Sequence, residues 1–167
     1  LASKNNMSAA LQSSDLLPKV LRLSLSEVPE VSAYFKNTLR AMFGEDGDKV
    51  RSYVQEISQT PWTPEKMRER LADIEEGEVL KSAMRRLRRD VMMSLVARDI
   101  TGLANLEEVV TAMSDLAEIT IDRTVSVYAK ELAKRFGVPR SETGVPQDLI
   151  VIGMGKLGGR ELNVSSD

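Results

Sequence analysis

The sequence contains no cysteine and no histidine. Without cysteine, the chain has neither a disulfide framework nor a thiolate metal site. Without histidine, Ser-His-Asp catalysis is excluded, and the commonest ligand of transition metals is missing. Any chemistry must therefore depend on Asp, Glu, Ser, Lys, Arg and backbone amides. Such groups suit a hard cation such as Mg²⁺ and a phosphate.

Aromatic residues are also scarce, at 4 % of the chain against 42 % for all hydrophobic residues. This balance favours helices that pack through aliphatic side chains. The formal net charge of -2 gives no support for nucleic-acid binding. No apolar run approaches the ~20 residues of a membrane span, and residues 1–11 lack the apolar core of a signal peptide. We therefore expect a cytoplasmic protein that binds neither nucleic acid nor a membrane.

Apolar residues recur at helical spacing through most of the chain. The spacing predicts helices over residues 28–43, 48–57, 63–76, 78–100 and 105–136. Thr63 and Asn105 are expected to cap the two helices that they begin, and Gly137 is expected to end the last one. Residues 1–25 are interpreted as a loose leader with a short helix near 16–23. The region from 28 to 136 should be almost wholly helical.

The chain changes character after a loop with Pro and Gly over residues 138–147. The β-branched run that follows predicts a strand over 148–153, the one convincing strand in the sequence. A single strand forms no sheet, so we expect the rest of the sheet to lie beyond Asp167. The predicted fold class is mainly α. A helical region over 1–104 precedes, over 105–167, the start of a truncated α/β domain with a long helix, a first strand and a Gly-rich turn.

The Gly-rich turn matches G-x-G-x-x-G over residues 153–158. A dinucleotide-binding fold would need an acidic residue ~20 positions further on. It would also favour apolar residues where Gly159, Arg160 and Glu161 stand. A turn without a ligand is a second alternative. The preferred interpretation is a phosphate cradle, in which glycine lets backbone N–H groups approach phosphate oxygens closely.

In this cradle, Lys156 and Arg160 would neutralise phosphate charge, and a helix beginning near Leu157 would add its N-terminal dipole. Asp167 would ligate a Mg²⁺ ion that bridges the phosphates of the nucleotide. The candidate phosphate-binding residues are Gly155, Lys156, Gly158, Gly159, Arg160 and Ser166.

The segment from Leu149 to Asp167 resembles the catalytic signature of glutamine synthetase adenylyltransferases. These enzymes belong to the DNA polymerase β nucleotidyltransferase superfamily, in which a strand ends in Gly-Ser or a variant and an Asp-x-Asp pair follows on the next strand. Gly155-Lys156 occupies the Gly-Ser position. Asp167 stands where the first metal-binding Asp belongs, and the second would lie two residues further on. Residues 80–108 are similar, more weakly, to the helical region of the family.

The resemblance implies a Mg²⁺-dependent nucleotidyltransferase domain over 105–167, with Asp167 as catalytic residue and metal ligand and ATP or ADP as the nucleotide. The sequence of residues 163–167 resembles that of one half of the family enzyme. This half removes AMP from glutamine synthetase by phosphorolysis and releases ADP. Glutamine synthetase and the nitrogen-signal protein PII are the implied partners. The 167-residue piece alone is expected to be inactive, because it carries only one of the two metal carboxylates.

Two other functions remain open. A PII uridylyltransferase shares the Glu-Leu-x-x-x-Ser-Asp motif seen over 161–167, but its Gly-Tyr-Gly-Arg motif differs from the sequence of residues 155–160. A helical protein-binding module with a degenerate nucleotide motif is the second. An Asp two positions beyond Asp167 would favour the enzyme. The basic cluster over 85–89 is either a solvated helix face, whose Arg stems cover apolar surface, or a docking surface for phosphate or protein.

Overall fold

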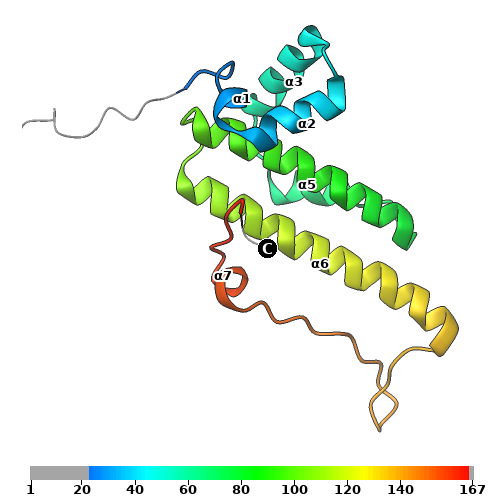
Figure 1. Ribbon diagram of the computed structural model, residues 1–167. Helices are drawn as coiled ribbons and strands as arrows, with labels where there is room; N and C mark the ends of the chain where they lie inside the picture. Colours follow the sequence, from blue (N-terminus) through cyan, green and yellow to red (C-terminus); the bar gives the residue numbers. More distant parts are fainter. Residues whose placement is uncertain (1–22, 166–167) are drawn as a thin grey trace, which may run out of the picture.

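The computed structural model describes residues 23–165 and shows a helical protein in that range (Figure 1). The helices are α1 (Val28–Val31), α2 (Ala33–Phe43), α3 (Gly47–Gln59), α4 (Pro64–Glu69), α5 (Gly77–Ile100), α6 (Leu106–Phe136) and α7 (Gly155–Gly158). No strand occurs within 28–136, so the mainly α fold class is confirmed. The leader and short helix expected over 1–25 lie almost entirely outside the described residues. Within residues 23–165, no helix is long and apolar enough to cross a membrane.

Helices α5 and α6 lie side by side and form the centre of the molecule (Figure 1). Their facing surfaces, with α4 and the turn after it, bury the larger of two apolar cores. Helices α1, α2 and α3 pack on another face of α5 and bury the smaller core. The larger core contains Met67, Leu71, Leu80, Ala83, Leu87, Val91, Met92, Leu95, Val109, Ala112, Met113, Leu116, Ile119 and Val127. The smaller core contains Val28, Phe35, Leu39, Val54, Met93 and Ala97.

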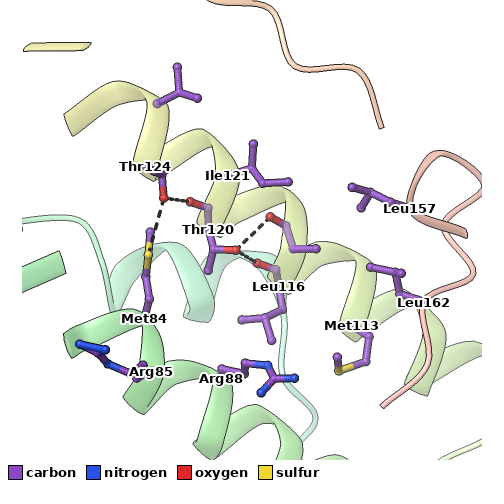
Figure 2. Close-up of a pocket in the computed structure, with 12 residues that line it drawn as sticks. Met84, Arg85, Arg88, Met113, Leu116, Thr120, Ile121, Thr124, Leu157 and Leu162 are labelled. Carbon is purple, nitrogen blue, oxygen red and sulfur yellow. Dashed lines mark hydrogen bonds between the residues drawn. The ribbon is translucent and has the colours of Figure 1, made fainter. Parts of the chain in front are cut away.

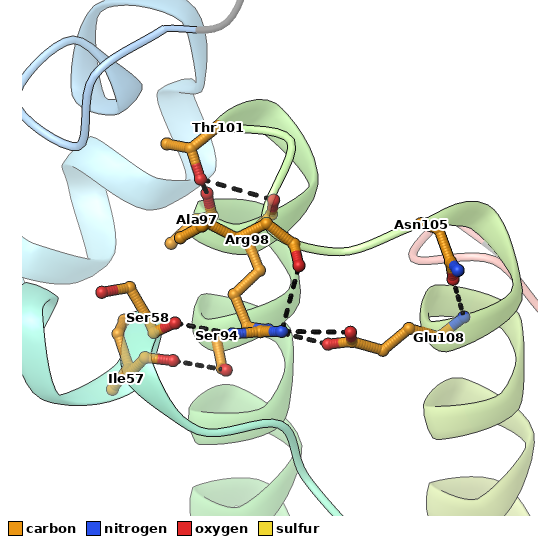
Figure 3. A network of polar contacts seen from close by, with 9 residues as sticks. Ile57, Ser58, Ser94, Ala97, Arg98, Thr101, Asn105 and Glu108 are labelled. Atoms are coloured by element: carbon orange, nitrogen blue, oxygen red, sulfur yellow. Dashed lines mark hydrogen bonds and ion pairs between the residues drawn. The ribbon is translucent and has the colours of Figure 1, made fainter.

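A buried arginine joins α3, α5 and α6 (Figure 3). Only 7 % of Arg98 is exposed. Its guanidinium donates two hydrogen bonds to the Glu108 carboxylate, at 2.7 and 3.1 Å, and one to the Ser58 carbonyl at 2.6 Å. A fourth hydrogen bond reaches the Leu103 carbonyl at 3.2 Å. A buried charge is stable when it is paired and fully hydrogen-bonded, so this network fixes the turn between α5 and α6.

The helix caps are partly as expected. Asn105 Oδ1 accepts the Glu108 N–H at 2.8 Å and so begins α6, and Thr63 caps α4 in the same way.

The single helix expected over 28–43 is wrong, because Ser32 divides it into α1 and α2. Ser32 has extended backbone, with φ -126° and ψ 101°, and its hydroxyl accepts the Phe35 N–H at 3.3 Å. Serine favours such a cap over a position inside a helix.

The helix expected over 63–76 is also too long, since α4 ends at Glu69. The reason is a side chain from α6. Arg123 donates hydrogen bonds to the carbonyls of Leu71, Ala72 and Ile74, at 3.0, 2.8 and 2.8 Å. A guanidinium thus satisfies carbonyls that a continuing helix would have bonded through its own amides.

The strand expected over 148–153 does not form in the described residues. The segment is without helix or strand, and the one bridge nearby joins Arg140 to Pro146. Leu149 and Ile152 are 71 % and 80 % exposed. A strand is defined by its hydrogen-bonded neighbour, and residues 23–165 offer none to this segment. The run of β-branched residues predicted a strand, but such a run does not specify the second strand with which it would pair.

Gly77 is the first residue of α5 and packs against the ring of Tyr128. A Cβ at position 77 would lie 2.7 Å from both Cζ and the hydroxyl oxygen of Tyr128. We therefore expect Gly77→Ala to lower the free energy of unfolding by about 1–3 kcal/mol through overpacking, measured by urea unfolding followed by circular dichroism. Gly47→Ala is the matched control, because Gly47 begins α3 and a Cβ there meets nothing within 4 Å. Equal stability of the two variants would contradict the prediction.

Candidate functional site

The candidate site is the Gly-rich turn around α7, which lies beside α6 (Figure 1). The helix expected near Leu157 begins at Gly155 and is only four residues long. The turn closes on itself: the Glu161 N–H donates to the Lys156 carbonyl at 2.7 Å. A Cβ at Gly158 would come within 2.5 Å of the Gly153 carbonyl oxygen, so this close approach requires glycine.

Arg160 ties the turn to α6. Its guanidinium donates to the Asp115 carboxylate at 2.5 Å and to the Glu118 carboxylate at 2.6 Å. The two acidic residues lie three positions apart, and therefore on one face of the helix. The hydrogen bond to Asp115, followed by that to Glu118, raises the pKa of Arg160 above its ordinary value, so the side chain stays charged.

Apolar contacts and one backbone hydrogen bond hold the residues after Arg160. Leu162 and Val164 pack against the larger core. The Leu162 N–H donates to the Ser114 hydroxyl at 3.4 Å, and that hydroxyl donates in turn to the Val110 carbonyl at 2.7 Å. Residues 160–164 are therefore anchored on the first half of α6, while the four residues of α7 stand further out.

A groove of about 620 Å³ lies between α5, α6 and the Gly-rich segment. Most of its lining is apolar, including Met84, Leu116 and Ile121 from the two long helices. Figure 2 shows Leu157 and Leu162 of the Gly-rich segment beside α6, and Arg85 and Arg88 on the α5 side. The two arginines are exposed. Two arginines of the basic cluster thus border an apolar groove next to the candidate site.

The structure separates the predicted phosphate-binding residues. Gly155, Lys156, Gly158 and Gly159 come together in the exposed turn. The Arg160 guanidinium faces the two carboxylates of α6. Ser166 and Asp167 lie outside the described residues, and no group of three acidic residues within 23–165 is placed to hold a metal ion.

Sequence reasoning missed Asp115 and Glu118. Periodicity placed the helix correctly, but nothing in its sequence indicates that these two carboxylates meet an arginine 42 to 45 positions further along the chain. The one signal in the sequence is that Asp115 stands among apolar residues of the helix. In the fold this residue is 7 % exposed. A buried carboxylate requires a partner.

Comparison with known proteins connects this turn to a family. The family model described as "Glutamate-ammonia ligase adenylyltransferase" matches residues 24–167, which include the Gly-rich turn and Asp167. The chain belongs to this family. The match also covers the helices before the turn, so the weaker resemblance upstream of residue 149 is part of the same relationship.

Three curated relatives share the name "Bifunctional glutamine synthetase adenylyltransferase/adenylyl-removing enzyme". A relative from Aromatoleum aromaticum is 51 % identical over 88 residues, covering 53 % of this chain and 9 % of its own length. One from Bordetella pertussis is 50 % identical over 91 residues, covering 54 % and 10 %. One from Nitrosomonas eutropha is 37 % identical over 151 residues, covering 86 % and 16 %. The chain therefore spans between about a tenth and a sixth of the relatives' length.

Proposed function

We propose that this chain is part of an enzyme that regulates glutamine synthetase by reversible adenylylation. The chain would carry the beginning of the adenylyl-removing site. The observation that carries this proposal is the family match over residues 24–167, which includes the whole Gly-rich turn. In the reaction proposed, inorganic phosphate attacks the AMP group on glutamine synthetase, the bond to the protein breaks, and ADP leaves. A cytoplasmic location follows from that substrate and belongs to the same proposal.

The exposed turn supports a role in phosphate binding. Lys156 is exposed and forms no ion pair within residues 23–165, whereas Arg160 is bound to two carboxylates. An ammonium group beside a Gly-rich backbone suits a phosphate when no carboxylate of the described residues neutralises its charge. We therefore assign the phosphate contacts of the described turn to Lys156 and to the backbone of Gly155, Gly158 and Gly159, and propose that Ser166 adds a hydroxyl.

The described residues do not contain a complete magnesium site, because no three acidic side chains within 23–165 are placed together for a metal. The Mg²⁺ dependence therefore rests on the resemblance at Asp167 and stays a proposal. When bound, the ion would neutralise phosphate charge.

The test is phosphate-dependent release of ADP from adenylylated glutamine synthetase by a full-length protein that contains this segment. We expect ADP to appear only when phosphate is supplied. A protein that instead transfers UMP to PII would support the uridylyltransferase alternative, and one without either activity would support a binding module.

Helix α5 is the proposed docking surface for glutamine synthetase, with PII as a second proposed partner of the full-length protein. Arg85 and Arg88 are exposed at the edge of the groove. Reversing both to Glu should weaken binding of glutamine synthetase by about 10-fold or more, because reversed charges at the edge of an interface oppose association. The measurement is a titration followed by surface plasmon resonance.

Arg86→Glu is the control for this prediction, because Arg86 is exposed on the same helix but does not line the groove. Circular dichroism would verify that each variant is folded. Unchanged binding by the folded double variant would make the basic helix purely structural.

A further inference from the structure

We infer that Arg160 is a positioning residue, which holds the Gly-rich turn on α6 through Asp115 and Glu118 and so sets where Lys156 lies. Arg160 is then not the phosphate ligand that its charge and its place in the motif suggest. Its consequence for catalysis rests on the proposed function, but the contact itself does not.

The geometry is that of a two-pronged clamp. One terminal nitrogen of the guanidinium donates to Asp115 at 2.5 Å and the other to Glu118 at 2.6 Å. The Arg160 backbone has φ 56°, a left-handed conformation that is unfavourable for a residue with a side chain. Such a conformation persists only where the surroundings hold it. Two backbone hydrogen bonds hold it, from the Arg160 N–H to the Leu157 carbonyl at 3.1 Å and from the Glu161 N–H to the Lys156 carbonyl at 2.7 Å, as at many helix ends. The two ion pairs and the packing of Leu162 then fix this helix end on α6.

Charge argues against phosphate binding by Arg160. A phosphate at this guanidinium would approach the carboxylates of Asp115 and Glu118, and like charges repel. Lys156, four positions earlier, has no ion pair with an acidic residue within residues 23–165. The two cations of the motif therefore have different roles. Lys156 is available to bind a ligand, and Arg160 is paired with carboxylates of the protein.

The two ends of the ion pair between Arg160 and Asp115 differ in burial, since the arginine side chain is 46 % exposed and the aspartate side chain 10 %. Asp115 is 7 % exposed, and Arg160 is the cation that pairs with it. Removing the charge of Asp115 leaves no buried ion behind, so the helices should remain folded. Removing Arg160 instead leaves a buried carboxylate without its cation. The Asp115→Asn variant can therefore release the turn while the fold stays intact.

The first test uses hydrogen exchange in the 167-residue chain and needs no activity. In Asp115→Asn and in Arg160→Gln, the amides of Glu161 and Leu162 should exchange about 10-fold faster, since their hydrogen bonds open with the turn. The double variant should exchange no faster than Arg160→Gln, because Asp115→Asn removes a contact that Arg160→Gln already removes. Asp122→Asn is the control, an exposed residue of the same helix. Unchanged exchange in both variants would overturn the clamp.

The second test measures kinetics in the full-length protein. As positioning changes, Asp115→Asn and Arg160→Gln should each lower kcat for ADP release about 10-fold through misplacement of the turn, with the KM for inorganic phosphate within about 3-fold. Arg160→Lys should rescue little, because a single ammonium lacks the planar fork that spans two carboxylates.

A phosphate ligand would behave differently. The KM for phosphate would then rise in Arg160→Gln, Arg160→Lys would retain function, and Asp115→Asn would keep its kcat; these results would overturn the inference. A wild-type protein that releases no ADP would instead refute the proposed function, and the exchange experiment would still decide whether the clamp exists.

Discussion

Replacing Glu108 by Ala is expected to lower the free energy of unfolding by about 3–5 kcal/mol, because it leaves the buried guanidinium of Arg98 without its carboxylate. Arg98 is 7 % exposed, and both of its hydrogen bonds to a carboxylate go to Glu108. Its remaining acceptors are the carbonyls of Ser58 and Leu103, which carry no net charge. Urea unfolding followed by circular dichroism measures the change.

Glu107→Ala is the matched control, since Glu107 is exposed in the same first turn of α6. It loses only a favourable interaction with the helix dipole, about 0.3–1 kcal/mol. Replacing the pair together, with Arg98→Met and Glu108→Leu, should recover much of the loss, because no buried charge then remains. A Glu108→Ala variant as stable as Glu107→Ala would show that the Arg98 charge is satisfied without Glu108.

In a full-length protein containing this segment, Asp167→Asn should reduce phosphate-dependent ADP release by roughly 10³-fold or more, comparable to losing a single transition-state stabiliser. Asparagine keeps the shape of aspartate but removes the negative charge that the resemblance assigns to metal binding. Transfer of AMP to glutamine synthetase should be largely spared, because by the same resemblance a separate half of the protein performs it. Release of ADP from adenylylated glutamine synthetase is the measurement.

Asp148→Asn is the control for this second prediction. Asp148 is exposed in the segment that leads into the Gly-rich turn, and removing its charge should leave ADP release unchanged. Wild-type release by Asp167→Asn would overturn the site assignment. A loss of both activities together would point to unfolding rather than chemistry, which circular dichroism of the variant would reveal.

The long helices were predictable because local spacing alone determines which of their faces is apolar. Helices α5 and α6 begin and end within one or two residues of the expected positions, and Asn105 caps α6 as its side chain suggests. The end of α4 was not predictable in the same way. It depends on Arg123, whose acceptors lie 49 to 52 residues away. No local pattern encodes such a contact.

The candidate site was predictable only in part. The glycines of residues 153–159 indicated a tight turn, and the structure places one there. The role of Arg160 depends on Asp115 and Glu118, which belong to another element, so its charge alone suggested the wrong kind of partner. The apolar run over 149–152 predicted a strand, but a strand requires a second one to pair with, and the described residues do not provide it.

The contact of Arg160 with Asp115 also closes a loop in the chain, since 45 positions separate the two residues. The chain follows α6 outward to Phe136 and then returns along it, so the Gly-rich turn docks near the start of the helix that it left (Figure 1). Closing a loop costs entropy that grows only with the logarithm of its length, about 0.6 kcal/mol for each doubling. The return segment can therefore change in length at residues 138–147 with little effect on docking.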